Sequence, residues 1–524
     1  MAIALSISSA WGSRPGSDSI VLSYSKLTGS RFDSLVVAKV GDIEITAKEF
    51  LLSYEYGPAF VKRAKDSKKR FLEFMIYEKL LALDGYSQRA DTSQIVAETL
   101  GEIEGDLATE ELYKEDVLSQ VTVSEEEIAA GVERAKLYIS LEWLYAPDFN
   151  EIDALQKRLS ADVSFDSLFA LQLSDSVQLE DRLMETTRFK LETRNPTLSA
   201  IVDTLRYGRN SASIGTGDGW YIVRIIDLWT NAITTETEQR RLRHNVSRAL
   251  FKRKADILSD QYIRRMMLDH DPVIKRQTFD ILRAYIGKSL FPPEQFAEWE
   301  LTKKLMAEFG PIDSVNVDEH LDKALVTLID RDIRLREFLA WYRVRDTTIH
   351  FSTASRQSFF VSLEQFIWRM VRDKLLIDQA MRRNMHQRES VTTQKEWWQD
   401  KCISALSKAR LAGEIHLDED LVKQHYEQNK NDYRGRGGAP LLWEKVKAEV
   451  RRDVHALEWN KRLLHRILDL KRKYSVAIND DVLSELPIDV ENEPDAIDIY
   501  AAKKGGTFPR PAFPTIDYEW RVWY

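Results

Sequence analysis

The feature that most constrains the fold of this chain is a set of three anchors that occurs twice in the same order. The anchors are an alternating apolar run followed by Glu-Phe-Leu and a tyrosine, a Lys-Leu-Leu triplet, and an acidic helix start. They fall at residues 42–54, 79–81 and 124–128, and again at residues 332–342, 374–376 and 417–421. Such repetition predicts two copies of one supersecondary unit. We therefore expect two related helix-rich lobes.

Strand and helix signals locate elements within each copy. Alternating apolar residues on both sides of Gly41-Asp42 predict a hairpin over residues 36–45. Thr46-Ala-Lys-Glu49 has the pattern of a capping box, which marks a helix start. In the second copy, Ser362-Leu-Glu-Gln365 predicts a helix start ahead of Phe366.

A stretch between the two copies has a different pattern. Strand-like runs open it at residues 138–145 and close it at residues 219–226, and apolar-periodic pieces lie at 152–159 and 165–173. Strands that bracket short helices over about a hundred residues predict a small α+β domain. The Gly-rich run at residues 213–219 predicts the turn into the last strand.

The closing part of this stretch carries a motif that spans three short segments. These are Leu205-Arg-Tyr-Gly208, residues 211–216, and Gly219-Trp-Tyr-Ile-Val223. The motif resembles the end of a parvulin-type peptidyl-prolyl isomerase domain, as found in the SurA, PpiD and PrsA family of envelope foldases. That resemblance implies a domain that binds polypeptide near proline and, in active members, rotates the prolyl bond.

The sequence departs from the family at the positions that matter for catalysis. The family's two histidines are replaced by Glu142 and Tyr221, and its methionine and phenylalanine fall on Arg194 and Leu198. The family's Gly-Asp-Leu-Gly turn is absent from residues 174–189. These substitutions indicate a degenerate domain.

Composition supports the same interpretation. The chain has nine histidines, of which the first is His244, and its single cysteine is Cys402. No imidazole or thiol therefore lies within residues 138–228 to polarise a prolyl amide. Rotation about the X–Pro bond needs only a pocket that favours the twisted amide, so residual isomerase activity stays an alternative. We predict a peptide-binding or structural module and assign no catalytic residue.

The expected fold is mainly α with a small α+β domain: a SurA-like helical chaperone core, internally duplicated, with one inserted parvulin-like domain. A Gly-rich loop takes the place of a second such domain in the second copy. The expected divisions are a leader or disordered tail (1–34), a first helical lobe (35–137), the degenerate parvulin-like domain (138–228), a connecting helical region (229–330), a second helical lobe (331–433), a C-terminal helix with a closing strand (434–485), and an extended tail (486–524).

Charge and hydropathy restrict the partners. The net charge is −8 and no long block of Lys and Arg occurs, so nucleic acid is not an expected partner. No apolar stretch reaches the length of a membrane-spanning helix. Residues 1–10 are apolar and small but lack basic residues. They fit either the remnant of a secretory signal whose start codon was assigned too late or a disordered tail. The family resemblance implies a periplasmic or envelope location.

Aromatic side chains are the candidate peptide contacts, because exposed aromatic area binds apolar sequence without selecting it. The candidates are Trp143, Tyr145, Phe189, Trp220, Tyr221, Trp341, Tyr342, Trp397 and Trp398. Adjacent residues on a helix do not share a face, so one of Trp397 and Trp398 should be partly exposed. The same rings also suit an oligomer contact, and the sequence does not separate the two roles.

The sequence carries no pattern for a metal or a cofactor. The histidines do not stand at zinc-binding spacings, and no P-loop, dinucleotide fingerprint or Gly-x-Ser-x-Gly motif occurs. Nothing around Cys402 indicates a lowered thiol pKa. We expect neither a metal nor a cofactor.

The last residues, 518–524, place apolar or aromatic side chains at every second position, which is a strand signature. A strand here would extend a sheet edge in this chain or in a partner. The interpretation that we favour is a tail that folds back onto an apolar surface.

Taken with the resemblance, these features predict an envelope chaperone that holds unfolded or nascent outer-membrane or secreted proteins and has lost isomerase activity. One alternative is an active parvulin-type isomerase. A second is a dedicated structural subunit of an envelope complex.

Overall fold

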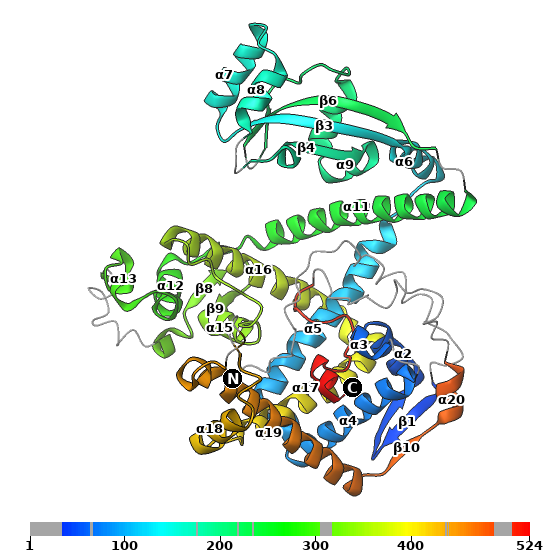
Figure 1. Ribbon diagram of the computed structural model, residues 1–524, viewed down its shortest axis with the longest axis vertical. Helices are drawn as coiled ribbons and strands as arrows, with labels where there is room; N and C mark the ends of the chain where they lie inside the picture. Colours follow the sequence, from blue (N-terminus) through cyan, green and yellow to red (C-terminus); the bar gives the residue numbers. More distant parts are fainter. Residues whose placement is uncertain are drawn as a thin grey trace. The chain divides into compact units, whose positions relative to one another are not determined.

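A computed structural model describes residues 34–62, 66–173, 177–216, 219–232, 235–303, 317–434, 438, 440–486 and 506–523. They form two units, shown in Figure 1: unit 2 comprises residues 113–265, and unit 1 comprises the described residues on either side of it. The fold is mainly α with small antiparallel sheets, as the sequence predicts. Residues 1–33 of the predicted leader and residues 487–505 of the predicted tail lie outside the described residues.

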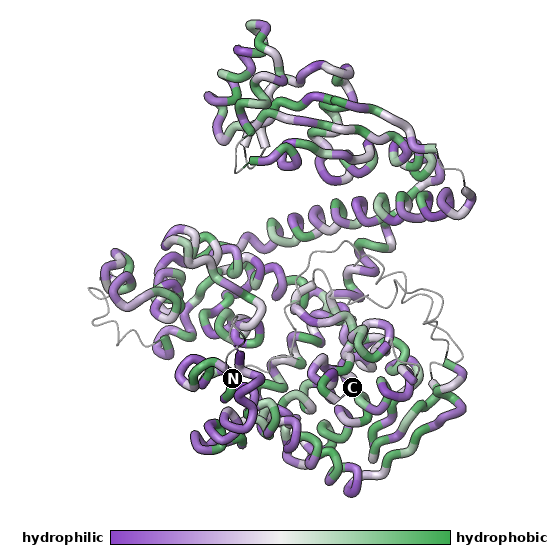
Figure 2. Tube along the Cα trace, in the orientation of Figure 1, coloured by the Kyte–Doolittle hydropathy of each residue, from purple (hydrophilic) through white to green (hydrophobic). Residues whose placement is uncertain are grey.

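Unit 2 is built around a four-stranded antiparallel sheet of order β4-β3-β6-β5. Its elements are η3 (Leu118–Gln120), α6 (Glu125–Lys136), β3 (Leu137–Ala146), α7 (Phe149–Ser160), α8 (Phe165–Gln172), η4 (Leu179–Arg182), β4 (Leu183–Thr187), α9 (Arg188–Arg194), α10 (Pro196–Thr204), β5 (Ile214–Gly215), β6 (Trp220–Thr230) and most of α11 (Glu236–His270). Figure 2 shows α11 as mostly hydrophilic.

Side chains alternate between the two faces of this sheet and form a separate core on each. On one face, Leu141 and Val223 pack with residues of α9 and α10. On the other face, Leu144 and Ile222 pack with Phe165 and its neighbours from α7 and α8. The sheet is therefore covered by helices on both faces.

Unit 1 contains two sets of elements whose order agrees except for the short helix Ala59–Lys62 of the first set. The first set is β1 (Val36–Val40), β2 (Ile43–Thr46), α2 (Ala47–Glu55), α3 (Ala59–Lys62), α4 (Ser67–Ser87), η2 (Ala90–Thr92) and α5 (Gln94–Asp116). The second set is β8 (Ala324–Thr327), β9 (Asp332–Arg334), α15 (Leu335–Arg343), α16 (Arg356–Arg382), η7 (Met385–Gln387) and α17 (Glu389–Gly413). Arg89 and Asn384, which precede η2 and η7, both have left-handed backbones with φ of 53° and 57°. Non-glycine residues rarely adopt this conformation, so the shared turn is informative.

The elements that follow also correspond. The stretch after α5 continues through α6 and α11 to β7 (Val273–Ile274), α12 (Arg276–Leu290) and α13 (Pro293–Ala297), with η6 (Val317–His320) before β8. The stretch after α17 continues through α18 (Glu419–Gln428) and α19 (Trp443–Lys473) to β10 (Val476–Ile478) and α20 (Asp480–Glu485). Between α6 and α11 the first stretch carries the elements from β3 to β6, whereas between α18 and α19 the second has an isolated antiparallel bridge between Arg434 and Pro440.

Each of the two small sheets of unit 1 joins strands that are far apart in the chain. Strand β10 pairs with β1 in the sheet β10-β1-β2, with Ala38 opposite Ile478. Strand β7 pairs with β8 in the sheet β7-β8-β9, with Val273 opposite Thr327. Each β-hairpin thus takes its third strand from the end of a long helix elsewhere in the sequence.

The two helix pairs of unit 1 interlock. Helix α4 packs on α17, where a Cβ on Gly85 would lie 2.6 Å from Ser407 Oγ. Helix α5 packs on α16, where a Cβ on Gly105 would lie 2.9 Å from Ile377 Cδ1. Such contacts are too close for a methyl group without movement of a neighbour, so each glycine allows close helix approach.

The structure corrects two local predictions. Helix α16 begins at Arg356 and is capped by the Ser355 hydroxyl, so the start predicted at Ser362 is wrong. The Ser355 cap lacks the Glu or Gln that identifies a capping box in a sequence. Residues 518–523 form the 3₁₀ helix η9 (Tyr518–Trp523), so the strand alternative is wrong; Trp520 lies in a hydrophobic core of unit 1, in agreement with the favoured interpretation of a tail that folds back onto an apolar surface.

Candidate functional site

The Glu142 side chain of unit 2 is held in a fixed ion pair. Glu142 on β3 lies opposite Arg224 on β6, and Arg224 Nε donates to Glu142 Oε1 at 2.5 Å. Arg224 also pairs with Asp166 of α8, and its guanidinium lies 4.4 Å from the centre of the Phe165 ring. Burial alone would lower the pKa of Arg224, but its hydrogen bonds to Asp166 and Glu142 raise it. Glu142 is therefore a structural anion.

The other three positions that resemble the family's site residues are Arg194, Leu198 and Tyr221, and they do not form one cluster with Glu142. Leu198 and Tyr221 pack against one core together with Trp143. Arg194 lies exposed at the end of α9. Glu142 belongs to the opposite face of the sheet, beside α8. The structure therefore brings Leu198 and Tyr221 together and leaves Glu142 and Arg194 apart from them.

Aromatic rings gather where β3 ends and β6 begins. Tyr145 and Tyr221 are cross-strand partners, and their ring centroids are 5.2 Å apart. Trp220, on the other face, lies 4.9 Å from Phe149, which is 51% exposed. Tyr145, Trp220 and Tyr221 are partly exposed. We call these four residues the aromatic end of the sheet.

Side chains next to the aromatic end hold its backbone in place. The Gln172 amide accepts from Tyr145 N at 3.0 Å and donates to Tyr145 O at 2.8 Å, as a neighbouring strand would. The Arg182 guanidinium lies 5.0 Å from the centre of the Tyr145 ring. The ring therefore has a fixed position and a nearby positive charge.

Several predicted peptide contacts are core residues. Phe189 packs against α6 and α11, and Trp341 is buried in the core formed with α15 and α16. Tyr342 is partly exposed and packs on Phe351 with ring centroids 5.4 Å apart.

The prediction that one of Trp397 and Trp398 is exposed is wrong, because the two rings are 7% and 1% exposed. They do point to different sides of α17, as helix geometry requires. Trp398 is covered by residues of α4 and α5, and Trp397 is covered by Leu52, Tyr56 and Phe513. A segment more than a hundred residues later in the chain, which includes Phe513, thus covers the side of α17 that was expected to be exposed.

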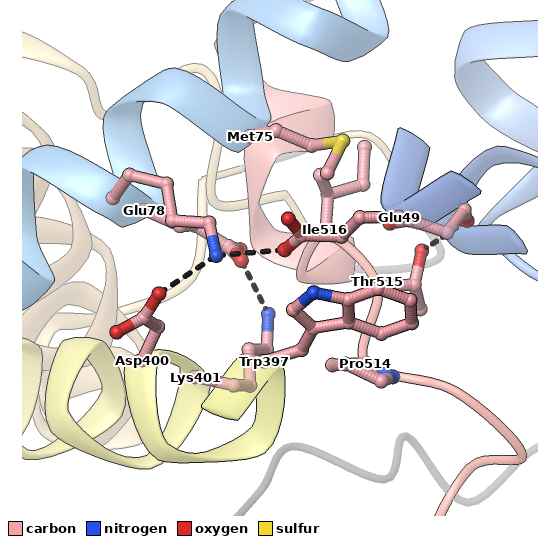
Figure 3. Close-up of a pocket in the computed structure, with 11 residues that line it drawn as sticks. Glu49, Met75, Glu78, Trp397, Asp400, Lys401, Pro514, Thr515 and Ile516 are labelled. Carbon is pink, nitrogen blue, oxygen red and sulfur yellow. Dashed lines mark hydrogen bonds and ion pairs between the residues drawn. The ribbon is translucent and has the colours of Figure 1, made fainter. Parts of the chain in front are cut away.

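That segment is residues 506–523, which we call the strap. It crosses unit 1 beside α17 and lines a partly open cavity of about 30 Å³, large enough for roughly one water molecule. Figure 3 shows residues that line the cavity, from α2, α4, α17 and the strap: Glu49, Met75, Glu78, Trp397, Asp400, Lys401, Pro514, Thr515 and Ile516.

Buried ion pairs surround this cavity. Lys79 Nζ lies 2.7 Å from Glu49 and 2.8 Å from Asp400. Lys401 Nζ lies 2.7 Å from Glu78 and 2.9 Å from Asp517 of the strap. Six charged side chains, four carboxylates and two ammonium groups, are therefore paired with one another, each with no more than 15% of its side chain exposed.

Burial and pairing shift the pKa values of these groups in opposite directions. Burial raises the pKa of Glu49, and the attraction of Lys79 offsets only part of this effect. Burial would lower the pKa of Lys79, but the attraction of Glu49 and Asp400 outweighs it and raises the pKa. For Asp517, burial acts to raise the pKa, and Lys401 and Lys408 lower it well below the usual value.

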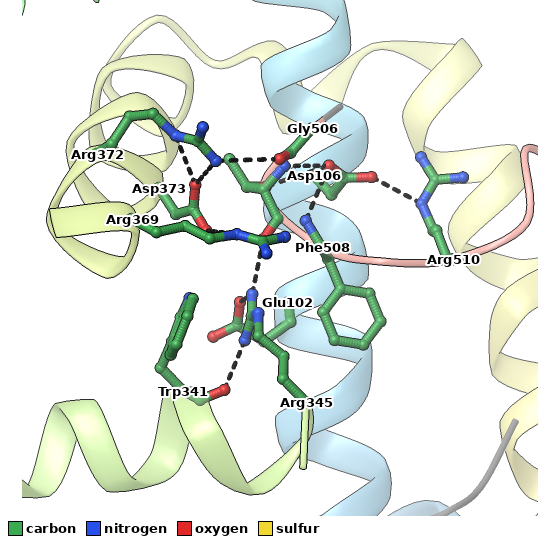
Figure 4. Close-up of polar contacts among 11 residues, drawn as sticks. Glu102, Asp106, Trp341, Arg345, Arg369, Arg372, Asp373, Gly506, Phe508 and Arg510 are labelled. Carbon is green, nitrogen blue, oxygen red and sulfur yellow. Dashed lines mark hydrogen bonds and ion pairs between the residues drawn. The ribbon is translucent and has the colours of Figure 1, made fainter. Parts of the chain in front are cut away.

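A second polar cluster holds the other end of the strap, as Figure 4 shows. Asp106 of α5 accepts from Thr507 N at 2.7 Å and from Arg510 Nε at 2.8 Å, and all three residues are buried. Arg345 donates to Thr507 O at 2.8 Å and to Glu102 at 2.5 Å. This cluster fixes the strap between α5 and the residues that follow α15.

The sequence offered one overlooked signal for these clusters. Asp106 follows Ile103 and precedes Leu107, and Glu78 lies among apolar residues of α4, so charges interrupt otherwise apolar helix faces. A charge on a buried face needs a partner. The sequence does not name that partner, because Arg510 and Asp517 lie hundreds of residues away.

The residues that the structure describes, 34–523 with the gaps given above, contain neither a metal-binding cluster nor a membrane-spanning helix. Within those ranges, no three His, Cys, Asp or Glu side chains are arranged to hold a metal ion. In the same ranges, no helix has both the length and the apolar composition required to cross a bilayer.

The chain matches no protein-family model and no curated protein sequence. Among solved structures, it is similar to the crystal structure of the peptidylprolyl isomerase PrsA from Bacillus cereus. The identity is 15%, the TM-score is 0.22, and the match covers 44% of this chain and 92% of that chain. At that TM-score the similarity supports no conclusion about fold or activity.

Proposed function

We propose that this protein is an envelope chaperone that holds unfolded outer-membrane or secreted polypeptides and does not isomerise prolyl bonds. The location and the clients follow from the sequence resemblance of residues 138–228 to foldase domains. The observation that carries the proposal is the contrast within unit 2: Glu142 is held by Arg224, whereas the aromatic end of the sheet is accessible.

The chemical argument against efficient catalysis concerns the groups beside a bound proline. A catalyst must stabilise the twisted amide more than the planar one. Glu142 has its charge compensated by Arg224 and lies on the face opposite Tyr221. No histidine occurs before His244 in the sequence, so unit 2 up to that point carries no imidazole.

The argument for binding concerns the aromatic end of the sheet. Phe149, Trp220, Tyr145 and Tyr221 supply apolar area whose backbone is already ordered, so little conformational entropy is lost on contact. Aromatic area binds apolar segments of varied sequence. Several weak contacts of this kind sum to useful affinity and still allow release.

The test measures light scattering from an unfolded outer-membrane protein diluted from denaturant, with and without the full chain. We expect suppressed aggregation that weakens severalfold in Trp220→Ala. Trp229→Ala is the matched control, because Trp229 lies at the other end of β6 and stacks on Tyr138 at 5.4 Å. Equal loss in both variants, or no suppression by the wild type, would contradict the proposal.

The two alternative functions have their own readouts. An active isomerase would accelerate proline-limited refolding, and that acceleration would vanish in Tyr221→Ala. If the protein is a dedicated subunit, one stoichiometric partner should copurify with it in client profiling. If it is a chaperone, many different polypeptides should copurify.

A further inference from the structure

The strap is bound through hydrogen bonds from its backbone, as peptide ligands often are. Residues 506–517 form no helix, and carboxylates of unit 1 accept their backbone N–H groups. Asp106 accepts from Thr507 N at 2.7 Å and Phe508 N at 3.2 Å, and Glu78 accepts from Asp517 N at 2.9 Å. Backbone contacts at both ends fix an extended polypeptide regardless of its side chains.

Side chains of the strap add specificity through two sites of opposite charge. Arg510 is fully buried and pairs with Asp106 and with Glu110 at 2.5 Å. Asp517 pairs with Lys401 at 2.9 Å and also with Lys408. The groove in which the strap lies therefore offers carboxylates to Arg510 near one end and ammonium groups to Asp517 near the other, which fixes the direction of the bound chain.

Two aromatic anchors complete the contact. Phe513 lies 5.2 Å from the Tyr56 ring and covers Trp397. Trp520 is fully buried, stacks on Phe74 at 5.6 Å, and donates its Nε1–H to Glu78 at 2.8 Å. Buried aromatic anchors of this kind carry most of the binding energy in peptide and protein interfaces.

The groove does not tolerate being empty. Without the strap, Asp106 loses Arg510, and Lys408 loses Asp517 and its other strap partner, Glu519. Unpaired buried charges are strongly unfavourable. A segment with matching charges that replaced the strap would restore these ion pairs.

The fit of the strap is incomplete at one point. Glu49 is 4% exposed, its Oε2 has no hydrogen-bond donor among the described protein atoms, and it lines the 30 Å³ cavity with Pro514. Figure 3 shows this side chain beside the strap. Proline has no N–H and no side-chain donor, so a segment with a donor near this position would satisfy Glu49 better than the strap does.

We propose that this groove, between Asp106 and Lys408, is a peptide-binding site that the strap occupies in cis and that binds an extended segment of another polypeptide in trans. The segment carries an arginine, an aromatic residue, an acidic residue and a tryptophan at spacings of three, four and three, as in residues 510, 513, 517 and 520. Charge complementarity at the two ends selects this partner. The site lies in unit 1 and does not rest on the binding role proposed for unit 2.

The experiment uses the full chain with a protease site inserted between residues 487 and 505. The probe is a fluorescent synthetic peptide of residues 506–523, measured by anisotropy before and after cleavage. Tethering supplies the strap at an effective concentration near the millimolar range, so cleavage should tighten apparent probe binding by at least about tenfold. The matched control peptide has Arg510 and Asp517 interchanged, which sets like charges against each other, and it should bind at least tenfold more weakly.

Three results would overturn the proposal. The first is equal binding of the interchanged peptide, and the second is no probe binding to a cleaved chain whose far-UV circular dichroism is unchanged. The third is a dimer of the uncut chain formed by strap exchange, which would assign the groove to a second copy. If cleavage unfolds the chain, amide hydrogen exchange of the uncut protein tests instead whether the probe displaces the strap. Excess probe should speed exchange at Thr507 and Phe508, and unchanged exchange would contradict the proposal.

Discussion

The two halves of unit 1 contain the same ion pair in different surroundings. Glu49 and Lys79 in the first half are 2.7 Å apart with side chains 5% and 8% exposed. Glu337 and Lys374 in the second half are 3.0 Å apart with side chains 28% and 26% exposed. The strap lies beside the first pair, since Pro514 to Ile516 line the cavity next to Glu49.

The difference in cover reverses the pKa shift of the glutamate. Burial dominates at Glu49 and raises its pKa. Burial also acts to raise the pKa of Glu337, but a hydrogen bond from Arg334 N and the attraction of Lys374 lower it overall. A glutamate–lysine pair is thus buried between α2 and α4 and partly exposed between α15 and α16, according to what packs over it.

The largest expected effect separates these two pairs. Lys79→Ala leaves Glu49 and Asp400 as uncompensated buried anions and should reduce the free energy of unfolding by roughly 3–5 kcal/mol. Lys374→Ala removes a partly exposed pair and should cost no more than about 1 kcal/mol. Urea unfolding of both full-length variants measures the contrast. Similar losses would mean that the strap does not seal the first pair.

The next effect concerns Asp373, the buried carboxylate that precedes Lys374 in α16. Burial raises the pKa of Asp373 to about 6, and Arg372 offsets part of that shift. Because this pKa lies above the usual 3.8, the protonated form favours folding, and its stabilisation is present below pH 4 and lost as pH rises through 6.

Asp373→Asn should therefore gain stability relative to the wild type between pH 4 and pH 7, by on the order of 1–3 kcal/mol. Chemical unfolding of both proteins at four or five pH values gives the difference directly. A difference that does not change with pH would show that Asp373 does not titrate in this range. Gln394→Asn is a control, since it changes a neutral buried side chain.

The smallest effects compare the two interlocked helix pairs. Gly85→Ala forces a methyl group against Ile403 and Ser407 and should destabilise the protein by about 1–2 kcal/mol after the helix-propensity gain. A methyl group on Gly105 would lie 2.9, 3.0 and 3.1 Å from Cδ1, Cγ1 and Cγ2 of Ile377, all of them side-chain atoms, so Gly105→Ala should cost less than Gly85→Ala. Gly101→Ala meets nothing within 4 Å and should stabilise α5 by about 0.5–1 kcal/mol. Thermal unfolding ranks the three, and any other order contradicts the described packing.

Much of the architecture follows from local patterns. The mainly α fold with a small α+β part is confirmed. Alternating residues before Thr46 form a strand pair, and the Thr46 hydroxyl caps α2 as the capping box predicts. The duplication remains a prediction, supported by the shared element order and by the left-handed Arg89 and Asn384.

What the sequence did not reveal depends on contacts between distant segments. Trp397 is buried by Phe513, and the partner of Asp106 is Arg510, about four hundred residues away. The alternating pattern of residues 518–524 is a strand signature, but Trp520 stacks on Phe74 of α4 from a 3₁₀ helix, and the sequence did not identify that surface. Local periodicity reports which side chains are apolar and not which distant surface receives them.

The most direct test of the whole account is one preparation assayed for both holding and catalysis on the same proline-containing client. We predict that the full chain, at stoichiometric amounts, suppresses aggregation of the unfolded client and leaves the rate of its proline-limited refolding unchanged. Faster refolding that is lost in Tyr221→Ala, without suppression of aggregation, would contradict the account.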